Sequence, residues 1–212
     1  MIKIDSVENS FWNEFYEKNG APKNPSNFAK ICIESIDKKD TLLELGCGNG
    51  RDSFFFSQNN INVIALDKSK TAITKNMTLG VPNISFRLQD FTRISASQVG
   101  ENIGNIYSRF TLHSIDKEAY IRTLNYCGHK LTSGHKLFIE ARTINDPLCG
   151  VGESCGDNGF VSTHYRRFLD MKETISDLTH LGFELEYAVE DYLDSWYKDD
   201  HAVVLRIIAR KK

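Results

Sequence analysis

The chain has 212 residues, a formal net charge of −2 and a hydrophobic content of 41%, values that suit a globular protein and exclude a fibrous or disordered one. Without a surplus of positive charge, non-specific nucleic-acid binding is disfavoured. No uncharged apolar run reaches the roughly 18 residues needed to cross a bilayer. We therefore expect a soluble, cytoplasmic protein that binds neither a membrane nor a nucleic acid.

The amino-terminal half begins with helical spacing and then alternates strand and helix signals. Leading helices are expected at 8–19 and 26–37. Strands are expected at 41–46, 62–67, 84–90, 105–110 and 135–142. Helices are expected between them at 52–60, 69–80, near Ala96 and at 116–131. This alternation predicts a parallel sheet covered by helices.

The carboxyl-terminal third departs from that alternation. Residues 143–163 are rich in glycine, asparagine, aspartate and serine, which predicts one long loop, and long loops often bind substrates. A helix is expected at 171–183, closed by a glycine, and two strands at 183–193 and 202–210 are expected to form an antiparallel hairpin.

The chain shows no internal repeat or linker, so we expect one domain over residues 1–212. Its leading helices, within residues 1–37, are a candidate lid, and residues 143–167 are a candidate acceptor-side loop. The aromatic residues that would form the lid, or equally pack in the core, are Phe11, Trp12 and Phe15.

The five cysteines are odd in number and contain no C-x-x-C pair, so reduced thiols are expected rather than a disulfide framework or a zinc site. Cys149 and Cys155 share a glycine-rich segment, which leaves a redox pair or metal ligation as an alternative for these two.

Three glycines at every second position, Gly46, Gly48 and Gly50, follow the first expected strand and precede a helix. Glycines placed there let a ligand approach the backbone and the amino end of the helix. A dinucleotide fingerprint reads G-x-G-x-x-G, whereas here the third glycine comes one residue earlier and Arg51 fills the later position. The spacing therefore predicts a cofactor site of a different type.

This G-x-G-x-G spacing, with Glu44 before it and with Asp67 and Asp90 ending the next two strands, resembles the class I S-adenosylmethionine-dependent methyltransferases over roughly residues 35–210. The resemblance implies a Rossmann-like three-layer α/β sandwich. Its seven-stranded sheet would be mostly parallel, with an antiparallel last strand.

The resemblance also implies roles for single residues around S-adenosylmethionine. The glycine loop would hold the methionine moiety, Asp67 the ribose hydroxyls, and Asp90 the adenine amino group. Alternatively, both aspartates merely cap the helices that follow them. The residues expected to bind the cofactor are Glu44, Gly46, Cys47, Gly48, Asn49, Gly50, Asp67, Lys68, Asp90 and Phe91.

Candidate acceptor-side residues follow the fourth expected strand, where Tyr107, Arg109, Leu112 and His113 form a Y-x-R-x-x-L-H segment. It looks like a segment found in several small-molecule and polysaccharide-modifying methyltransferases. His113, with an ordinary pKa near 6.5, is the first candidate for a general base. It could instead only hydrogen-bond the turn or the cofactor carboxylate, and Arg109 could hold a structural carboxylate.

A second cluster follows the fifth expected strand and the long loop. Arginines bind carboxylates and phosphates in bidentate fashion, so this cluster predicts an anionic acceptor, unless it is only a solvated loop face. The catalytic candidates are His113, Arg109, His164 and Tyr165. The substrate-binding candidates are Arg142, Arg166 and Arg167. No metal is assigned; Glu140, Asp146 and His164 could form a ligand set, but their spacing is not diagnostic, so metal dependence stays open.

The hypothesis that unites these features is methyl transfer from S-adenosylmethionine to an oxygen, and less favourably a nitrogen, of an anionic metabolite or activated sugar. Modification of bacterial surface or capsular polysaccharide is the setting that the resemblance suggests. The alternatives are a non-catalytic S-adenosylmethionine-binding sensor or scaffold, and an NAD oxidoreductase.

Overall fold

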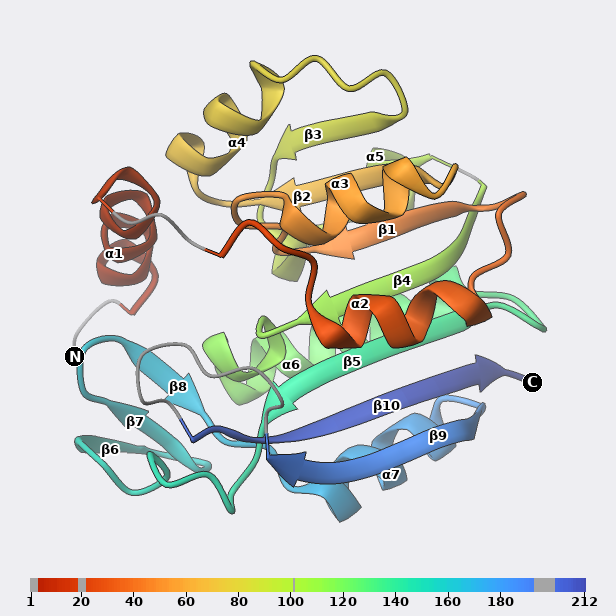
Figure 1. Cartoon of the computed structure of the whole chain (residues 1–212). Coiled ribbons are helices and arrows are strands. Elements are labelled where there is room, and N and C mark those ends of the chain that lie inside the picture. The colour runs from red at the N-terminus through yellow and green to blue at the C-terminus, as the bar shows by residue number, and fades with distance from the viewer. Residues whose placement is uncertain (1–3, 19–21, 101, 193–200) are drawn as a thin grey trace. The chain divides into compact units, whose positions relative to one another are not determined.

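The structure, a computed structural model, describes residues 4–18, 22–100, 102–192 and 201–212 (Figure 1). Its helices are α1 (Ile4–Lys18), α2 (Asn27–Cys32), α3 (Arg51–Gln58), α4 (Lys70–Met77), α5 (Ala96–Val99), α6 (Lys117–Lys130) and α7 (Met171–His180). Its longer strands are β1 (Thr41–Leu45), β2 (Asn62–Asp67), β3 (Ile84–Leu88), β4 (Ile103–Arg109), β5 (Lys136–Arg142), β9 (Phe183–Tyr192) and β10 (Val203–Lys211).

These seven strands share one sheet in the order β3-β2-β1-β4-β5-β10-β9. β1, β2 and β3 pair in parallel, whereas β10 pairs antiparallel with both β5 and β9. The expected seven-stranded, mostly parallel sheet with a reversed last strand is confirmed. The residues that join β9 to β10, 193–200, lie outside the described part, as does residue 19 of the first expected helix.

The chain divides into two compact units, residues 1–106 and 107–212. In the first unit, α3 packs on β2 and α4 on β3, as Figure 1 shows. Its strands bury continuous apolar runs, with Leu42, Leu43 and Leu45 of β1 almost inaccessible to solvent, as expected for strands covered on both faces. Ser69 caps α4 by accepting a hydrogen bond from the Ala72 backbone N–H (3.2 Å).

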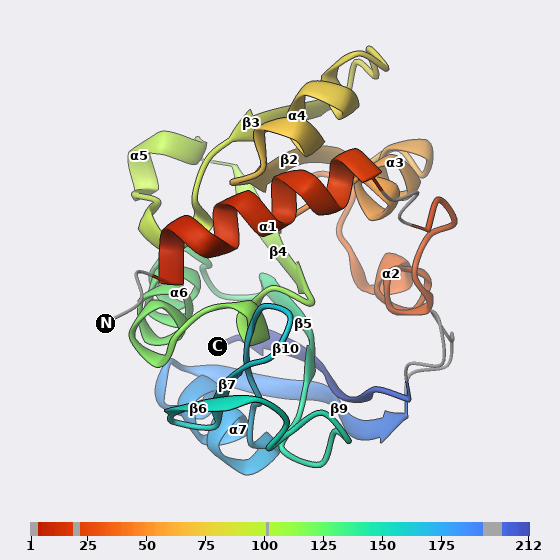
Figure 2. The ribbon, with the colours of Figure 1, turned by 90° about the vertical axis from the view of Figure 1, so that its left-hand side faces the viewer.

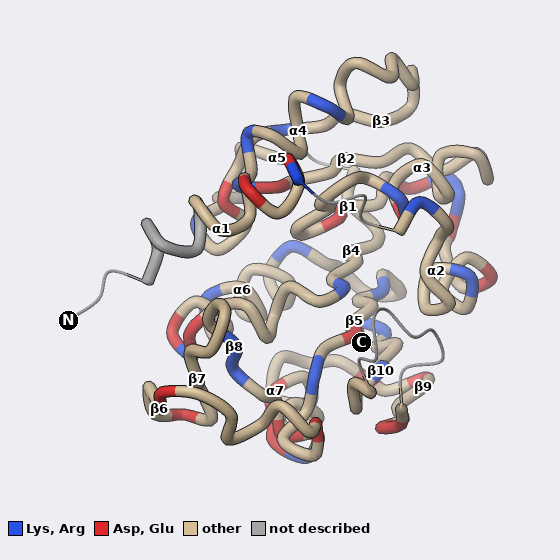
Figure 3. The backbone as a smooth tube through the Cα atoms, turned by 60° about the vertical axis from the view of Figure 1, so that its left-hand side comes forward, with Lys and Arg blue, Asp and Glu red and all other residues tan. Residues whose placement is uncertain are grey.

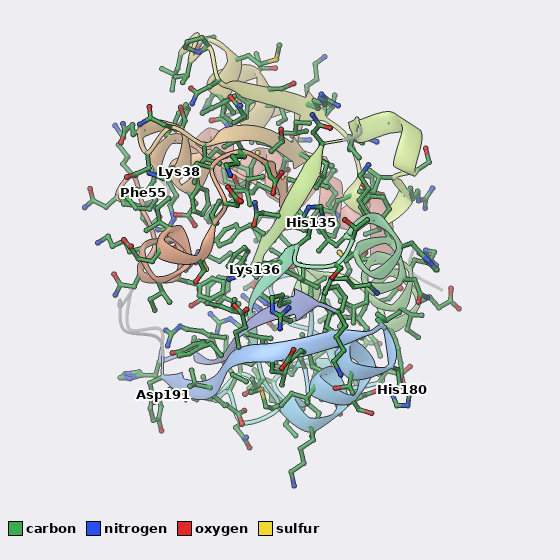
Figure 4. All side chains as sticks on the ribbon, turned by 90° about the vertical axis from the view of Figure 1, so that its right-hand side faces the viewer. Lys38, Phe55, His135, Lys136, His180 and Asp191 are labelled. Carbon is green, nitrogen blue, oxygen red and sulfur yellow. The ribbon has the colours of Figure 1, made fainter. Side chains whose placement is uncertain are left out.

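In the second unit, β5 and β10 supply the apolar centre, and α7 packs on β9. Aspartates begin both long helices: Asp116 accepts a bond from the Ala119 N–H (2.7 Å), and Asp170 one from the Glu173 N–H (2.9 Å). Figure 4 labels His135 and Lys136, which lead into β5. No helix in the described part of the chain is long and apolar enough to span a membrane.

Two expected elements, the loop at 143–163 and the helix at 26–37, differ from the structure. The segment 143–163 is not one loop, because β6 (Glu153–Gly156) and β7 (Gly159–Val161) form a hairpin that β8 (Tyr165–Arg167) extends into a three-stranded antiparallel sheet. The hairpin turns at Asp157 and Asn158, both with positive φ (51° and 59°), as in a two-residue turn of the primed type. These three strands are too short for the alternation of apolar and polar residues that would have predicted them from the sequence.

The second expected helix, 26–37, ends early. Ser26 caps α2 as expected for its start, but the α-helix stops at Cys32 and a single turn of 3-10 helix, Ile33–Ser35, follows. A tighter last turn of this kind satisfies the orphan carbonyls at a helix end.

Candidate cofactor and acceptor sites

The loop between β1 and α3 has three left-handed glycines. Gly46, Gly48 and Gly50 have φ values of 73°, 53° and 74°, which residues with side chains adopt only with strain. A Cβ on Gly50 would also approach the amide nitrogen of Asn76 to 3.1 Å, and that amide donates to the Gly48 carbonyl (2.8 Å). The loop is therefore fixed in a conformation that its glycines alone permit.

Asp67, the last residue of β2, binds this loop from the neighbouring strand. Its Oδ2 accepts the Gly48 N–H (2.8 Å) and its Oδ1 accepts the Ser69 N–H (2.8 Å). Burial raises the pKa of this carboxyl, and the two backbone bonds oppose that rise. A carboxylate has about four acceptor positions, so Asp67 keeps acceptor capacity beyond these bonds for a donor such as a ribose hydroxyl.

Glu44 lies under the loop and is almost fully buried. Burial first, and then repulsion by Asp52, raises its pKa to about 8, so the carboxyl stays protonated near neutral pH. Its partner is the Ser53 hydroxyl, which donates to Glu44 Oε2. Asp52 is held in turn by Ser26, through the backbone N–H (2.7 Å) and the hydroxyl (2.8 Å).

The other cofactor candidates of this unit include Asp90, Cys47, Lys68 and Phe91. Asp90 accepts from the N–H and hydroxyl of Thr92 (2.9 and 2.7 Å), so it does cap a short helix. Burial raises the pKa of the Cys47 thiol well above its ordinary value, which makes the thiol inert. Lys68 and Phe91 are half-buried at the ends of β2 and β3.

Around the end of β5, the second unit contains an ionic triad, in which Arg109 and Arg206 share Glu140, and a separate buried ion pair. Glu140 lies 2.8 Å from Arg109 Nε and accepts a hydrogen bond from Arg206 Nε (2.7 Å). Arg142 Nη1 donates to Asp146 Oδ2 (2.9 Å). Each carboxylate therefore has an arginine partner, and no group of three or more metal-binding side chains gathers in the residues that the structure describes.

His113 is buried beside these pairs. Its Nδ1 accepts a hydrogen bond from the Arg142 backbone N–H (3.3 Å), which favours the tautomer with the proton on Nε2. Burial, followed by the charges of Arg142 and Arg166, lowers its pKa well below the ordinary value. The ring is therefore neutral near pH 7, and Nε2 is a hydrogen-bond donor rather than a base.

His164 is half-buried and is affected by the same two arginines as His113. Burial, Arg166 and Arg142 lower its pKa to about 3. Its Nδ1 lies 3.1 Å from the Thr163 hydroxyl, and Arg166 Nη1 lies 3.3 Å from the Ser162 hydroxyl. Arg142 and Arg166 lower the pKa of both histidines. We therefore treat His113, Arg142, His164 and Arg166 as one electropositive group.

Residues of β8 alternate between two faces, which separates candidates that are adjacent in sequence. Arg166 is half-exposed, whereas Tyr165 and Arg167 are buried. Burial raises the pKa of Tyr165 to about 12, so its phenol stays protonated. The Arg167 guanidinium lies over the ring of Tyr120, 4.3 Å from its centroid. Figure 3 shows the arginine colouring of β8.

Phe110 is a residue of this group that sequence reasoning missed. Its φ of 58° is unusual for a residue with a side chain, and its N–H donates to the Glu140 carbonyl (2.8 Å). The Arg109 and Arg142 guanidinium carbons lie 4.2 and 5.7 Å from its ring centroid, and the His113 ring meets its edge at 5.2 Å. The one feature of the sequence that could have pointed to Phe110 is its position between the candidates Arg109 and His113.

Comparison with known proteins gives a family match. Residues 36–135 match the family model described as a methyltransferase domain. The protein has the fold of a class I S-adenosylmethionine-dependent methyltransferase. The resemblance predicted from the glycine spacing is thus confirmed, with S-adenosylmethionine as the cofactor. No curated protein matches this chain in sequence.

Solved structures show the same fold at low identity. A methyltransferase from Anabaena variabilis has a TM-score of 0.74 and 19% identity, over 100% of this chain and 96% of that one. The 1,6-didemethyltoxoflavin-N1-methyltransferase of Burkholderia thailandensis, bound to S-adenosylhomocysteine, has a TM-score of 0.70 and 16% identity, over 98% and 88%. The cyclase SpnF has a TM-score of 0.70 and 12% identity, over 97% and 92%.

The site around the glycine loop fits the cofactor. Gly48 and Gly50 have left-handed backbones, and the space beside them is filled by side chains of the protein itself, Tyr16 at Gly48 and Phe54 with Asn76 at Gly50. Asp67 retains acceptor positions beside the loop, and its negative charge suits a neutral diol and disfavours a phosphate. These features match a nucleoside without phosphates, as S-adenosylmethionine is.

Proposed function

We propose that this methyltransferase transfers the methyl group of S-adenosylmethionine to an oxygen of a small anionic acceptor. The observation that carries the proposal is the electropositive group of the second unit. Burial first, and then the charges of Arg142 and Arg166, lowers the pKa values of His113 and His164. A carboxylate or phosphate on the acceptor would offset these charges.

Arg166 is the residue proposed to bind that anion. Arg142 is committed through Nη1 to Asp146, and Arg109 to Glu140, both in buried pairs. Arg166 is half-exposed, and its Nη1 lies 3.3 Å from the neutral Ser162 hydroxyl. An anionic group would therefore form with Arg166 a stronger, charge-assisted bond.

The two histidines are proposed to divide the proton chemistry. When bound, S-adenosylmethionine supplies an electrophilic methyl group. His113, with its proton on Nε2, would donate a hydrogen bond and orient the acceptor. His164 would accept the proton that the acceptor hydroxyl loses as the new carbon–oxygen bond forms. An anion beside Arg166 would offset the charge of that arginine, the second cause of the lowered pKa of His164 after burial, and so would raise this pKa and favour proton uptake.

The first experiment measures S-adenosylhomocysteine formation with a panel of acceptors. The panel contains hydroxy acids, sugar phosphates and nucleotide-activated sugars, the last because the resemblance suggests polysaccharide modification, and each anionic acceptor is paired with its neutral analogue. We expect turnover with anionic acceptors and little with the neutral analogues. Equal turnover with the neutral analogues contradicts the proposal, as does its absence with every oxygen acceptor.

Single substitutions test the residue roles. Replacing His164 with alanine should lower kcat by about 10²- to 10⁴-fold, the usual contribution of a general base, with S-adenosylhomocysteine affinity retained. His180 provides the matched control, because it lies exposed on α7 (Figure 4). A His164→Ala enzyme as active as His180→Ala would exclude His164 as the base.

Two other functions would use the same fold. Nitrogen methylation finds support in the relative from Burkholderia thailandensis, which is an N1-methyltransferase, and amine acceptors in the panel test it. Cofactor binding without methyl transfer finds support in the cyclase SpnF, whose fold serves other chemistry. A protein that binds S-adenosylhomocysteine but shows no turnover with any acceptor would favour this second function.

A further inference from the structure

Helix α1 lies along α4 in the first unit, as Figure 2 shows, and reaches the glycine loop through Tyr16. A Cβ built on Gly48 would lie 2.9 Å from the Cζ atom of Tyr16 and nearer still to its hydroxyl oxygen. The phenol therefore sits directly on the middle glycine of the loop. Gly48 has no room for a side chain, because Tyr16 fills that space.

Polar contacts fix α1 and the segment after it in this position. Asn13 Oδ1 accepts from the Ser69 hydroxyl (2.8 Å) and from the Thr71 N–H (3.2 Å), both at the start of α4. The Lys75 ammonium donates to the Tyr16 carbonyl (2.7 Å).

A further bond joins the loop itself to the segment after α1. The Asn49 side chain donates to the Pro22 carbonyl (2.9 Å). The polar contacts thus run from α1 and its following segment to the glycine loop and to the residues just beyond Asp67, the two elements that hold the cofactor.

From this geometry we propose that Tyr16 binds the cofactor: its hydroxyl donates a hydrogen bond to the methionine carboxylate of S-adenosylmethionine, with α1 as the lid of the site. The inference rests on the cofactor of the proposed function and adds a binding residue to it. Near neutral pH a phenol is a neutral donor. The carboxylate is the anionic group of the cofactor and needs donors, whereas Asp67 offers acceptors.

The hydroxyl can be tested apart from the ring. The Tyr16 ring packs in an aromatic cluster, 5.2 Å from Phe15 edge-to-face and 6.2 Å from Trp12 in a stacked arrangement. Replacing Tyr16 with phenylalanine keeps these contacts and removes only the oxygen. Glu14→Gln is the matched control on the same helix, because Glu14 is exposed and pairs only locally with Lys18.

The experiment measures calorimetric affinities of the full chain for S-adenosylhomocysteine and for methylthioadenosine, which lacks the amino-acid end. We expect Tyr16→Phe to weaken S-adenosylhomocysteine binding about three- to ten-fold, as the loss of one hydrogen bond does. Methylthioadenosine should bind Tyr16→Phe and wild type equally, and Glu14→Gln should match wild type with both ligands.

Three results would overturn the inference in distinguishable ways. Unchanged S-adenosylhomocysteine affinity in Tyr16→Phe would show that the hydroxyl makes no cofactor contact. An equal loss with both ligands would place any contact away from the carboxylate. Failure of the wild-type chain to bind S-adenosylhomocysteine would instead remove the proposed function itself, and this inference with it.

Discussion

Replacing Glu44 with glutamine should make the stability of the protein less sensitive to pH. The folded-state pKa of Glu44 is raised from 4.5 to about 8, by burial and then by repulsion from Asp52. Once the chain unfolds, the carboxyl regains its ordinary pKa. Between these two values the folded state holds a proton that the unfolded state has lost, so the free energy of unfolding falls as pH rises through this window.

The size of the effect follows from the width of the window. Each pH unit in which only the folded state holds the proton removes about 1.4 kcal/mol of stability. From pH 5 to pH 8, Glu44 should therefore remove on the order of 3 kcal/mol, a large part of a typical 5–15 kcal/mol. Glutamine stays neutral at every pH and can still accept the Ser53 hydroxyl hydrogen bond.

Urea unfolding of wild type and Glu44→Gln at several pH values between 5 and 8 measures this slope. The difference between the two proteins isolates Glu44, because His113 and His164 titrate in both. Their lowered pKa values act in the opposite direction, adding stability as pH rises toward neutrality. Glu34→Gln, at an exposed position, is the control. Parallel pH profiles for wild type and Glu44→Gln would refute the argument.

Three other substitutions test polar groups of the two units. Asp67→Ala leaves two backbone N–H groups without their acceptor and should destabilise the fold by about 2–5 kcal/mol. Asp90→Ala, at a part-buried cap, should destabilise it by about 1 kcal/mol. Equal losses of unfolding free energy in urea would contradict this ranking. Glu140→Gln leaves two arginines without their shared counter-charge and should destabilise by about 3–5 kcal/mol, and a change below about 0.5 kcal/mol would exclude the triad as a structural element.

The sheet and the cofactor loop could be predicted because their signals are local. Strands covered on both faces appear as short apolar runs, such as that of β1. The aspartate that ends β2 can likewise be recognised from a single sequence, because it directly follows such a run. The glycine positions also carry their own physical reason, since each has a left-handed backbone.

The acceptor side was harder to predict because tertiary contacts decide it. Arg166 and Arg167 look equivalent in sequence, yet the strand places them on opposite faces and buries the second against an aromatic ring. The tautomer of His113 depends on a backbone N–H that lies 29 residues away in the chain. The Tyr16 contact with Gly48 likewise joins distant segments, and no local pattern predicts it.

The most direct measurement is a crystal structure of the protein with S-adenosylhomocysteine. The account predicts both ribose hydroxyls within hydrogen-bond distance of the Asp67 carboxylate, and the amino-acid portion over the loop from Gly46 to Gly50. A ligand bound elsewhere, or a ribose held by other side chains with Asp67 still engaged only by its two backbone N–H groups, would contradict it.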